Sequence, residues 1–304
     1  MKTAPHLFTL RQLQYVVAVA DALSFSRAAQ ACHVSQPSLS AQLAQVERAL
    51  GVRLFERSRR RVLVTSAGRE LVERARRLLC EADDLGEAAR RAQDPLGGEL
   101  RVGVIPTVAP YVLPEVVPSL RRAFPKLTLL WREDRTADLV ERLESGGLDA
   151  ALVARESALG DVEHAELAVD PFVLVTRPAD PLGHGGPIAR VALRDAPVLV
   201  LDEGHCFGDQ VLTFCSRVRA NDLEFRATSL ATLAQMVAGG AGVTLLPQLA
   251  VRAEVPRGRL AVRRFVAPAP SRTLALVWRP RSPLAPALRE VARVLREAWP
   301  TRAV

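Results

Sequence analysis

Apolar residues recur at the spacing of an α-helix throughout residues 9–50. The pattern predicts three helices here, separated by short polar segments, with a tight turn between the second and the third. Ser35 is suited to cap the third helix, whose first turn tolerates Pro37, and Gly51 is suited to end it. The buried stripe of this helix consists of Leu39, Leu43, Val46 and Leu50.

A small β-wing and a long helix are predicted next. A short strand at 62–64 follows an arginine-rich tip, and Thr65 or Ser66 can cap a helix that runs to about residue 92. Polar residues surround the apolar stripe of this helix, so it cannot bury much within its own chain, and we expect it to pair with a second copy. The stripe consists of Leu71, Ala75, Leu78, Ala82, Leu85 and Ala89.

Strands and helices alternate beyond a linker at 93–98, which predicts a mostly parallel sheet covered by helices. About 210 residues would fill two such subdomains, so we predict an α/β effector domain of two Rossmann-like subdomains behind an all-α winged helix-turn-helix and a long linker helix. Strands are expected at 100–104, 127–131, 150–153, 172–176, 198–201, 243–246 and 273–277, and helices at about 109–123, 136–145, 230–239 and 284–298.

The distribution of charge along the chain indicates a polyanion as a candidate partner. The net charge is +8, of which residues 1–94 carry +5 and the remainder +3. A basic N-terminal third favours nucleic-acid binding, although a solvated, arginine-rich surface explains the charge equally well. No apolar run reaches the roughly 18 residues that span a membrane, and the N-terminal segment lacks the apolar core of a signal peptide. A cytoplasmic protein without a membrane partner is expected.

The polar face of the third helix carries short hydroxyl and amide side chains that suit base edges and phosphates. Arginines of the wing suit flanking phosphates. An ordinary helical hairpin with a polar outer face is the alternative. The candidate DNA contacts are Ser35, Gln36, Pro37, Ser38, Ser40, Gln42, Arg57, Arg59, Arg60 and Arg61.

Four cysteines are present, and in the cytoplasm they begin as thiols. They form no zinc-type spacing with each other or with histidine, so neither a metal nor a cofactor is expected. Cys206 and Cys215 lie nine positions apart in a polar stretch, and His205 is a potential cation beside the first thiol. A thiolate attacks peroxide and a nearby thiol then closes a disulfide, whereas two inert buried thiols are the alternative. Cys32 and Cys80 are expected to have no redox role.

The N-terminal pattern resembles the signature of LysR-type transcriptional regulators. The matching segments are 25–29, 34–40, 43–47, 50–51, 54–57 and 65–68. The resemblance implies a bacterial protein with a winged helix-turn-helix domain at 1–66, a dimerising linker helix at 67–92 and an effector domain at 93–304 similar to periplasmic binding proteins. Its subdomains would be 95–168 with 270–304, and 169–269.

Segments of the effector domain are similar to those of the OxyR peroxide sensors, namely 103–107, 201–215, 225–230, 242–247 and 272–273. This resemblance implies that hydrogen peroxide oxidises Cys206, the peroxidatic cysteine, and that Cys215 is the resolving cysteine. It implies a peroxide pocket of Thr107, Thr136, His205, Asp209 and Arg272.

The same resemblance implies several partners: a double-stranded DNA operator, a dimer of dimers, RNA polymerase, and a thiol reductant such as glutaredoxin or thioredoxin. Two other functions fit parts of the chain. One is a LysR-type regulator that answers a metabolite and has incidental cysteines. The other is a thiol peroxidase, against which the predicted recognition helix argues.

The spacing of the two cysteines predicts a switch. If residues 207–215 are helical in the reduced protein, they span roughly 13 Å, whereas a disulfide needs Cα atoms within about 7 Å. Oxidation would then refold this segment, with Gly204 and Gly208 providing backbone freedom.

Overall fold

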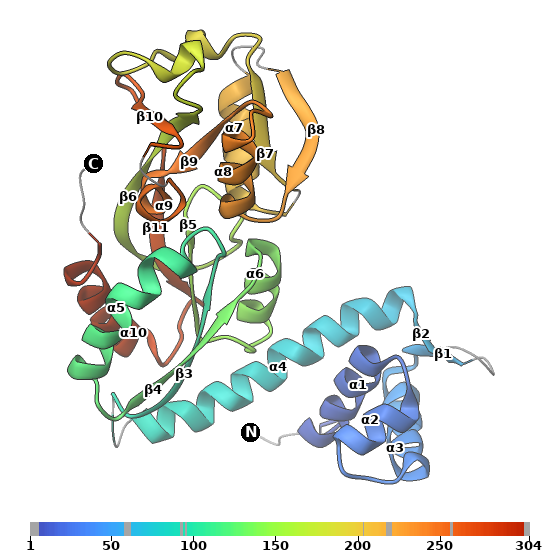
Figure 1. Cartoon of the computed structure of the whole chain (residues 1–304). Coiled ribbons are helices and arrows are strands. Elements are labelled where there is room, and N and C mark those ends of the chain that lie inside the picture. Colours follow the sequence, from blue (N-terminus) through green and yellow to red (C-terminus); the bar gives the residue numbers. More distant parts are fainter. Residues whose placement is uncertain are drawn as a thin grey trace. The chain divides into compact units, whose positions relative to one another are not determined.

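The computed structural model describes residues 6–57, 62–91, 94, 96–202, 204–216, 221–255 and 258–300. The chain forms two compact units, Met1–Arg90 with Glu144–Gly146, and Arg91–Leu143 with Gly147–Val304. No helix within those ranges is both long and apolar enough to cross a lipid bilayer. Figure 1 shows the elements of each unit.

The three predicted N-terminal helices are confirmed. Ser35 Oγ accepts a hydrogen bond from Ser38 N at 3.3 Å and so caps the third helix, while Gly51 ends it with φ +70°. The apolar stripe meets the other two helices in a small core that includes Leu39, Leu43 and Val46. The helices are α1 (Leu10–Ala22), α2 (Phe25–Ala31) and α3 (Gln36–Leu50).

The wing and the long helix follow in the same unit. Strands β1 (Phe55–Arg57) and β2 (Val62–Val64) pair antiparallel, and α4 covers Ser66–Arg91. Thr65 rather than Ser66 supplies the cap, because Thr65 Oγ1 accepts a hydrogen bond from Gly68 N at 2.8 Å. The start of α4 is anchored in the N-terminal core, whereas Leu78 and Leu85 further along are 49% and 75% exposed.

The second unit is built on one mixed sheet rather than the mostly parallel sheet expected. Its strand order is β4-β3-β5-β11-β6-β9-β7-β8, and β10 pairs with β6. The prediction was wrong because β6 and β11 run antiparallel to their neighbours and join two groups of parallel strands. The strands are β3 (Gly98–Val104), β4 (Leu127–Glu133), β5 (Ala150–Ala154), β6 (Glu163–Thr176), β7 (Pro197–Leu201), β8 (Asn221–Ala227), β9 (Val243–Pro247), β10 (Ala261–Arg264) and β11 (Ser271–Trp278).

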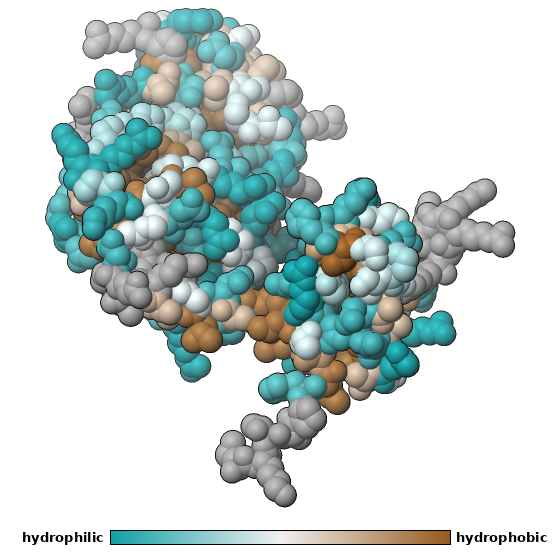
Figure 2. Space-filling model, turned by 90° about the horizontal axis from the view of Figure 1, so that it is seen from below, coloured by the Kyte–Doolittle hydropathy of each residue, from teal (hydrophilic) through white to brown (hydrophobic). Residues whose placement is uncertain are grey.

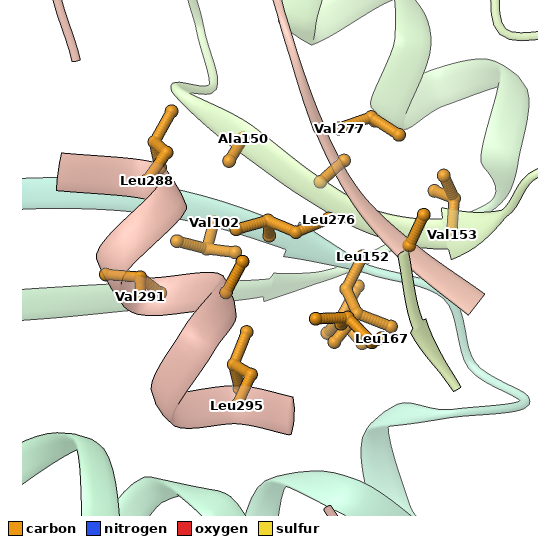
Figure 3. Packing of buried hydrophobic residues seen from close by; sticks show 14 of the residues in the cluster. Val102, Ala150, Leu152, Val153, Leu167, Leu276, Val277, Leu288, Val291 and Leu295 are labelled. Atoms are coloured by element: carbon orange, nitrogen blue, oxygen red, sulfur yellow. The ribbon is translucent and has the colours of Figure 1, made fainter. Parts of the chain in front are cut away.

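Two separate hydrophobic cores lie along this sheet, in agreement with the two subdomains expected. In the first, Leu288, Val291 and Leu295 of α10 pack on the strands that carry Val102 and Leu276 (Figure 3). The second core is built around β7 and β9. The covering helices are α5 (Ala109–Ala123), α6 (Thr136–Glu144), α7 (Cys206–Ser216), α8 (Leu230–Ala238), α9 (Gln248–Glu254) and α10 (Ala285–Glu297), with 3-10 turns at Pro181–Gly183 and Arg190–Leu193.

Strand β6 belongs to both subdomains. Its first half pairs with β11 in the first subdomain, and its second half pairs with β9 and β10 in the second. The sequence pattern predicted only residues 172–176 of this strand, because polar and apolar residues are interspersed along its first half. The cysteine-containing segment begins close to this shared strand. The ring of Phe172 in β6 packs edge-on against the ring of Phe207 in α7, with 4.9 Å between the ring centroids.

Candidate functional site

Cys206 is the first residue of α7, and Cys215 lies in its last turn. Helix α7 follows β7 after a short turn in which Gly204 has φ +87°, a backbone conformation that glycine adopts without strain. Both cysteines are free thiols. Cys206 is half-buried and packs against the first core, whereas Cys215 is buried in the second.

Residues 207–215 are helical, as the predicted switch supposes. Nine residues at 1.5 Å each separate the two cysteines by roughly 13 Å along the helix axis. A disulfide requires Cα atoms within about 7 Å. The two thiols therefore cannot bond while α7 is intact, and a disulfide between them requires this helix to unwind.

A small pocket of about 10 Å³ lies beside Cys206, with room for one molecule of about the size of water. The structure brings together three of the predicted site residues here, namely Thr107, Thr136 and His205. The buried hydroxyl of Thr136 has no hydrogen-bond partner among the described residues. A buried hydroxyl without a partner is costly, so this one is suited to bind a small polar ligand. Ile105, Pro106, Arg135 and Gly204 complete the lining.

Asp209 lies elsewhere, on a larger pocket of about 640 Å³ that shares Cys206 and Thr136 with the small one. Its side chain is exposed, one turn along α7 from the thiol. Gln210 and Ser157 also line this pocket, and their buried polar atoms have no partner within the described ranges. Cys206 is thus reached from an opening that Asp209 and Thr136 line together, whereas Thr107 lines only the small pocket.

Arg272 lines neither of these two pockets. Its side chain is fully buried and forms an ion pair with Asp170, with Nη2 2.9 Å from Oδ2. Its Nη1 donates to Thr107 Oγ1 at 2.7 Å, and Nη2 donates to Thr107 O at 3.1 Å. The guanidinium also lies over the Phe207 ring at 5.2 Å. Arg272 therefore orients Thr107, whose hydroxyl keeps its own proton to donate toward the pocket.

Asp170 holds this arginine in place. Burial raises the pKa of the Asp170 carboxyl, while the Arg272 guanidinium and the backbone N–H of Leu249 act against this shift. A buried charge of this kind is stable only with its partner present. Sequence reasoning missed Asp170, because it lies 102 positions from Arg272 and no local motif marks it.

His205 does not supply the cation expected beside the thiol. Burial lowers the pKa of the imidazole, and the nearby Arg135 guanidinium lowers it further, so His205 is neutral at pH 7. The positive groups near Cys206 are instead the N-terminal end of α7, where the helix dipole favours negative charge, and Arg135. Arg135 was also missed, although its place directly before the predicted helix at 136 was visible in the sequence.

The predicted DNA-contacting residues of α3 lie mostly on its outer surface. Ser35, Gln36, Pro37 and Ser38 are exposed around its N-terminus, whereas Ser40 and Gln42 are half-buried. Gln42 Oε1 accepts a hydrogen bond from Gln12 Nε2 of α1 at 2.8 Å, which ties the amide to its own domain.

The wing is described only in part. Arg57 lies in β1, and its side chain is outside the described part of the chain, as are residues 59–61. The proposed phosphate contacts of the wing arginines therefore stay predictions.

No group of three or more His, Cys, Asp or Glu residues within the described ranges is arranged to hold a metal ion. Cys32 ends α2 and is half-buried, and Cys80 is a buried residue of α4. Each lies in a different part of the fold from α7.

Two family models match the chain. A bacterial regulatory helix-turn-helix of the LysR family matches residues 10–69, and a LysR substrate-binding domain matches residues 93–300. The hydrogen peroxide-inducible genes activator of Dickeya chrysanthemi is 43% identical over 289 residues, which is 95% of each chain. The DNA-binding transcriptional dual regulator OxyR of Escherichia coli K12 is 41% identical over 94% of each chain.

Solved structures of OxyR proteins are also similar to this chain. Full-length OxyR from Pseudomonas aeruginosa, as a cysteine-to-aspartate variant, is 35% identical, with a TM-score of 0.78 and coverage of 99% of this chain and all of the other. A hydrogen peroxide-bound cysteine-to-serine mutant of Corynebacterium glutamicum OxyR is also 35% identical, with a TM-score of 0.66 and coverage of 98% and 94%. The chain belongs to the LysR family of bacterial transcriptional regulators and, within it, to the OxyR group.

Proposed function

We propose that this OxyR-type regulator responds to hydrogen peroxide through Cys206 as the peroxidatic cysteine and Cys215 as the resolving cysteine. The observation that carries the proposal is the small pocket in which Cys206 meets Thr107 and the unpartnered hydroxyl of Thr136. A peroxide oxygen held by these hydroxyls lies next to the sulfur. Neighbouring positive charge, from Arg135 and the start of α7, stabilises the thiolate that attacks it.

The chemistry proceeds in two steps. The Cys206 thiolate attacks one peroxide oxygen, an S–O bond forms, the O–O bond breaks, and hydroxide leaves and takes up a proton. Cys206 is thereby oxidised to a sulfenic acid, and peroxide is reduced to water. Cys215 then attacks the Cys206 sulfur, an S–S bond forms, and a second water leaves. Reduction of the disulfide by a thiol system such as glutaredoxin or thioredoxin resets the protein.

Mass spectrometry of single-cysteine variants tests this assignment. Cys206→Ser is expected to form no sulfenic acid and no intramolecular disulfide after peroxide. Cys215→Ser is expected to react once and stop at a sulfenic acid, which dimedone traps. Cys32→Ser and Cys80→Ser serve as matched controls that keep the Cys206–Cys215 disulfide. Peroxide-dependent switching of transcription that persists in Cys206→Ser contradicts the assignment.

The helix-turn-helix reads the DNA operator in this proposal. The exposed start of α3 enters the major groove with Gln36 and Ser38, and the wing arginines contact phosphates. Arg60→Ala is expected to weaken binding to all sequences and to reduce the salt slope by about 0.9 per lost phosphate contact. Ser38→Ala is expected to change sequence preference instead. Footprinting and binding isotherms at several salt concentrations distinguish the two effects.

In this proposal the protein forms a dimer, assembled further as a dimer of dimers, which provides paired DNA-binding domains. Leu78 and Leu85 of α4 are exposed leucines on the stripe predicted to pair with a second copy. Figure 2 shows hydrophobic residues interrupting an otherwise largely hydrophilic face of the molecule. Substitution of both leucines by arginine is expected to give monomers with weak operator binding, measured by sedimentation. RNA polymerase is the proposed downstream partner. The proposal includes no multiple-turnover peroxidase activity.

A further inference from the structure

We propose that the larger pocket beside Cys206 binds the substituent of organic hydroperoxides, so that this sensor reacts with them as well as with hydrogen peroxide. This inference rests on the proposed function, because it takes Cys206 as the thiol that is oxidised. The pocket has a volume of about 640 Å³, within the range typical of sites for small organic molecules. A small apolar substituent therefore has a place to bind within reach of the sulfur.

The larger pocket joins the small one at the reactive cysteine. The small pocket, of about 10 Å³, has room for about one water-sized group, whereas a peroxide is built on a pair of oxygen atoms. Cys206, Thr136 and Gly204 line both pockets, so they surround the junction between them. A peroxide whose attacked oxygen lies at this junction, beside the sulfur, can extend its other end into the larger pocket.

The wall of the larger pocket suits an alkyl or aryl group. Most of its surface is apolar, and the apolar side chains come from α6, the segment after β5, β6, α7 and the segment before β11. Burial of apolar surface is favourable by about 25 cal/mol per Å², so a substituent against this wall is more stable than one in solvent. The apolar residues are Ala137, Ala158, Phe172, Phe214 and Pro270.

The acidic residues of the lining are compatible with an uncharged substituent. Glu156 accepts hydrogen bonds from Thr273 N with both carboxylate oxygens, at 2.8 and 3.1 Å. Asp209 is exposed, so solvent reaches its carboxylate. Neither group is a buried, unpaired charge, which would favour a polar or cationic ligand instead.

The reaction follows the same course as with hydrogen peroxide. The Cys206 thiolate attacks the terminal oxygen of R–O–O–H, an S–O bond forms, and the O–O bond breaks. The alkoxide leaves with the electron pair and takes up a proton, so the hydroperoxide is reduced to the alcohol ROH and Cys206 is oxidised to a sulfenic acid. Cys215 then displaces water from the Cys206 sulfur and forms the disulfide. One alcohol molecule is released for each disulfide.

Rapid-quench oxidation of the reduced full-length protein by cumene hydroperoxide tests this inference. Hydrogen peroxide is the reference oxidant, and N-acetylcysteine is the reference thiol without a pocket. Mass spectrometry measures the Cys206–Cys215 disulfide, and chromatography measures the cumyl alcohol released with it. For each oxidant we divide the rate constant of the protein by that of N-acetylcysteine. We expect the two accelerations to agree within about tenfold, which corresponds to about 1.4 kcal/mol of barrier.

A larger side chain at position 158 narrows the larger pocket. Ala158 is an exposed residue of its wall and does not line the small pocket. Ala158→Trp is expected to lower the ratio of the cumene hydroperoxide rate constant to the hydrogen peroxide rate constant about tenfold, through lost contact between the phenyl ring and the wall. Ala123→Trp, at the exposed last residue of α5, is the matched control and is expected to keep the ratio of the parent.

Two results would overturn this inference and leave the proposed function intact. The first is acceleration of the reaction with hydrogen peroxide but not with cumene hydroperoxide. The second is an equal ratio of rate constants in Ala158→Trp and Ala123→Trp. A protein that forms no Cys206–Cys215 disulfide with either oxidant contradicts the proposed function itself. The comparison with N-acetylcysteine uses the unmodified chain, so it holds even where a variant folds poorly.

Discussion

The two ends of helix α7 differ in almost every respect that matters for reactivity. At the first residue, Cys206 is half-buried, borders two pockets and packs against the first core. Near the last residue, Cys215 is buried in the second core. The first thiol is placed to meet a small polar molecule, and the second is shielded from it. In the proposed function this difference sets the order of reaction: the oxidant is expected to reach Cys206 first, and Cys215 is expected to become available only after the helix unwinds.

The aromatic anchors of the two ends also differ. Phe207, beside the reactive cysteine, is fully buried between Phe172 and Arg272. Phe214, beside the shielded cysteine, is half-buried and packs edge-on against Phe265 at 5.2 Å, under the Arg190 guanidinium. The Cys206 end of α7 is therefore held more firmly than the Cys215 end. Unwinding driven by the disulfide must overcome one of these anchors, and the weaker is at the Cys215 end.

Alanine substitutions at the two anchors give the largest expected effects. Phe207→Ala is expected to lower the free energy of unfolding of the effector domain by about 3–5 kcal/mol, because it leaves a cavity in a closed core. Phe214→Ala is expected to cost about half as much, because its ring is partly exposed already. Urea denaturation of both variants measures the difference, and equal losses would show that the two ends are anchored alike.

Amide hydrogen exchange across α7 reports whether this helix unwinds on oxidation. Oxidation by peroxide is expected to speed amide exchange within residues 206–216 on the order of 100-fold, since the disulfide cannot form on an intact helix. The Cys206→Ser protein treated with peroxide is the control and is expected to retain the slow exchange of the reduced state. Equal protection in the reduced and oxidised proteins contradicts a switch based on unwinding.

Gly208, between the two ends, is expected to have a smaller effect. A Cβ atom added there would lie 2.9 Å from the backbone oxygen of Leu201, too close for α7 to keep its position on β7. Gly208→Ala is therefore expected to destabilise the domain by about 1–3 kcal/mol. Gly86→Ala is the matched control, because a Cβ there meets nothing within 4 Å, and it is expected to stabilise α4 slightly. Thermal unfolding of both variants tests the contrast.

The smallest predicted effect is the pH dependence contributed by His205. In the unfolded chain the imidazole takes up a proton near pH 6.5, whereas burial lowers its pKa in the folded protein. Stability from this group is therefore present above pH 6.5 and is lost as the pH falls below it. We expect the melting temperature of the parent to fall on the order of 1 °C more than that of His205→Asn between pH 7.5 and pH 5.5. Parallel melting curves for the two proteins over this range would argue against a neutral, buried His205.

Sequence patterns predicted the regular elements well where local spacing determines them. Helix α5 begins and ends where its apolar period does, and Ser35 and Gly51 mark the ends of the recognition helix as expected. Helix α9 and strands β8 and β10 escaped prediction, because each is short and has mixed polarity, so neither period stands out. Their positions are set by packing against the sheet.

The site could be predicted only in part, for a different reason. Thr107, Thr136 and Cys206 meet across three distant segments, and only the family resemblance grouped them in advance. The same resemblance placed Asp209 and Arg272 with them. Asp209 lines the larger pocket together with Cys206 and Thr136, and Arg272 donates a hydrogen bond to Thr107 without lining either pocket. The charge state of His205 depends on burial, which no local sequence pattern reveals.

Strand β6 has a consequence for how force passes through the effector domain. Binding proteins with two subdomains commonly close around a ligand by bending at a few linker residues. Here a continuous strand of 14 residues is hydrogen-bonded to both halves, and β11 pairs with it along most of the first half. Bending within either half would break a ladder of backbone hydrogen bonds, so each half is stiff. Bending is least restricted at Pro171–Phe172, where the pairing of β6 passes from β11 to β9 and β10. If the proposed disulfide refolds α7, we expect the change to act at this junction, because Phe207 of α7 packs against Phe172 of β6.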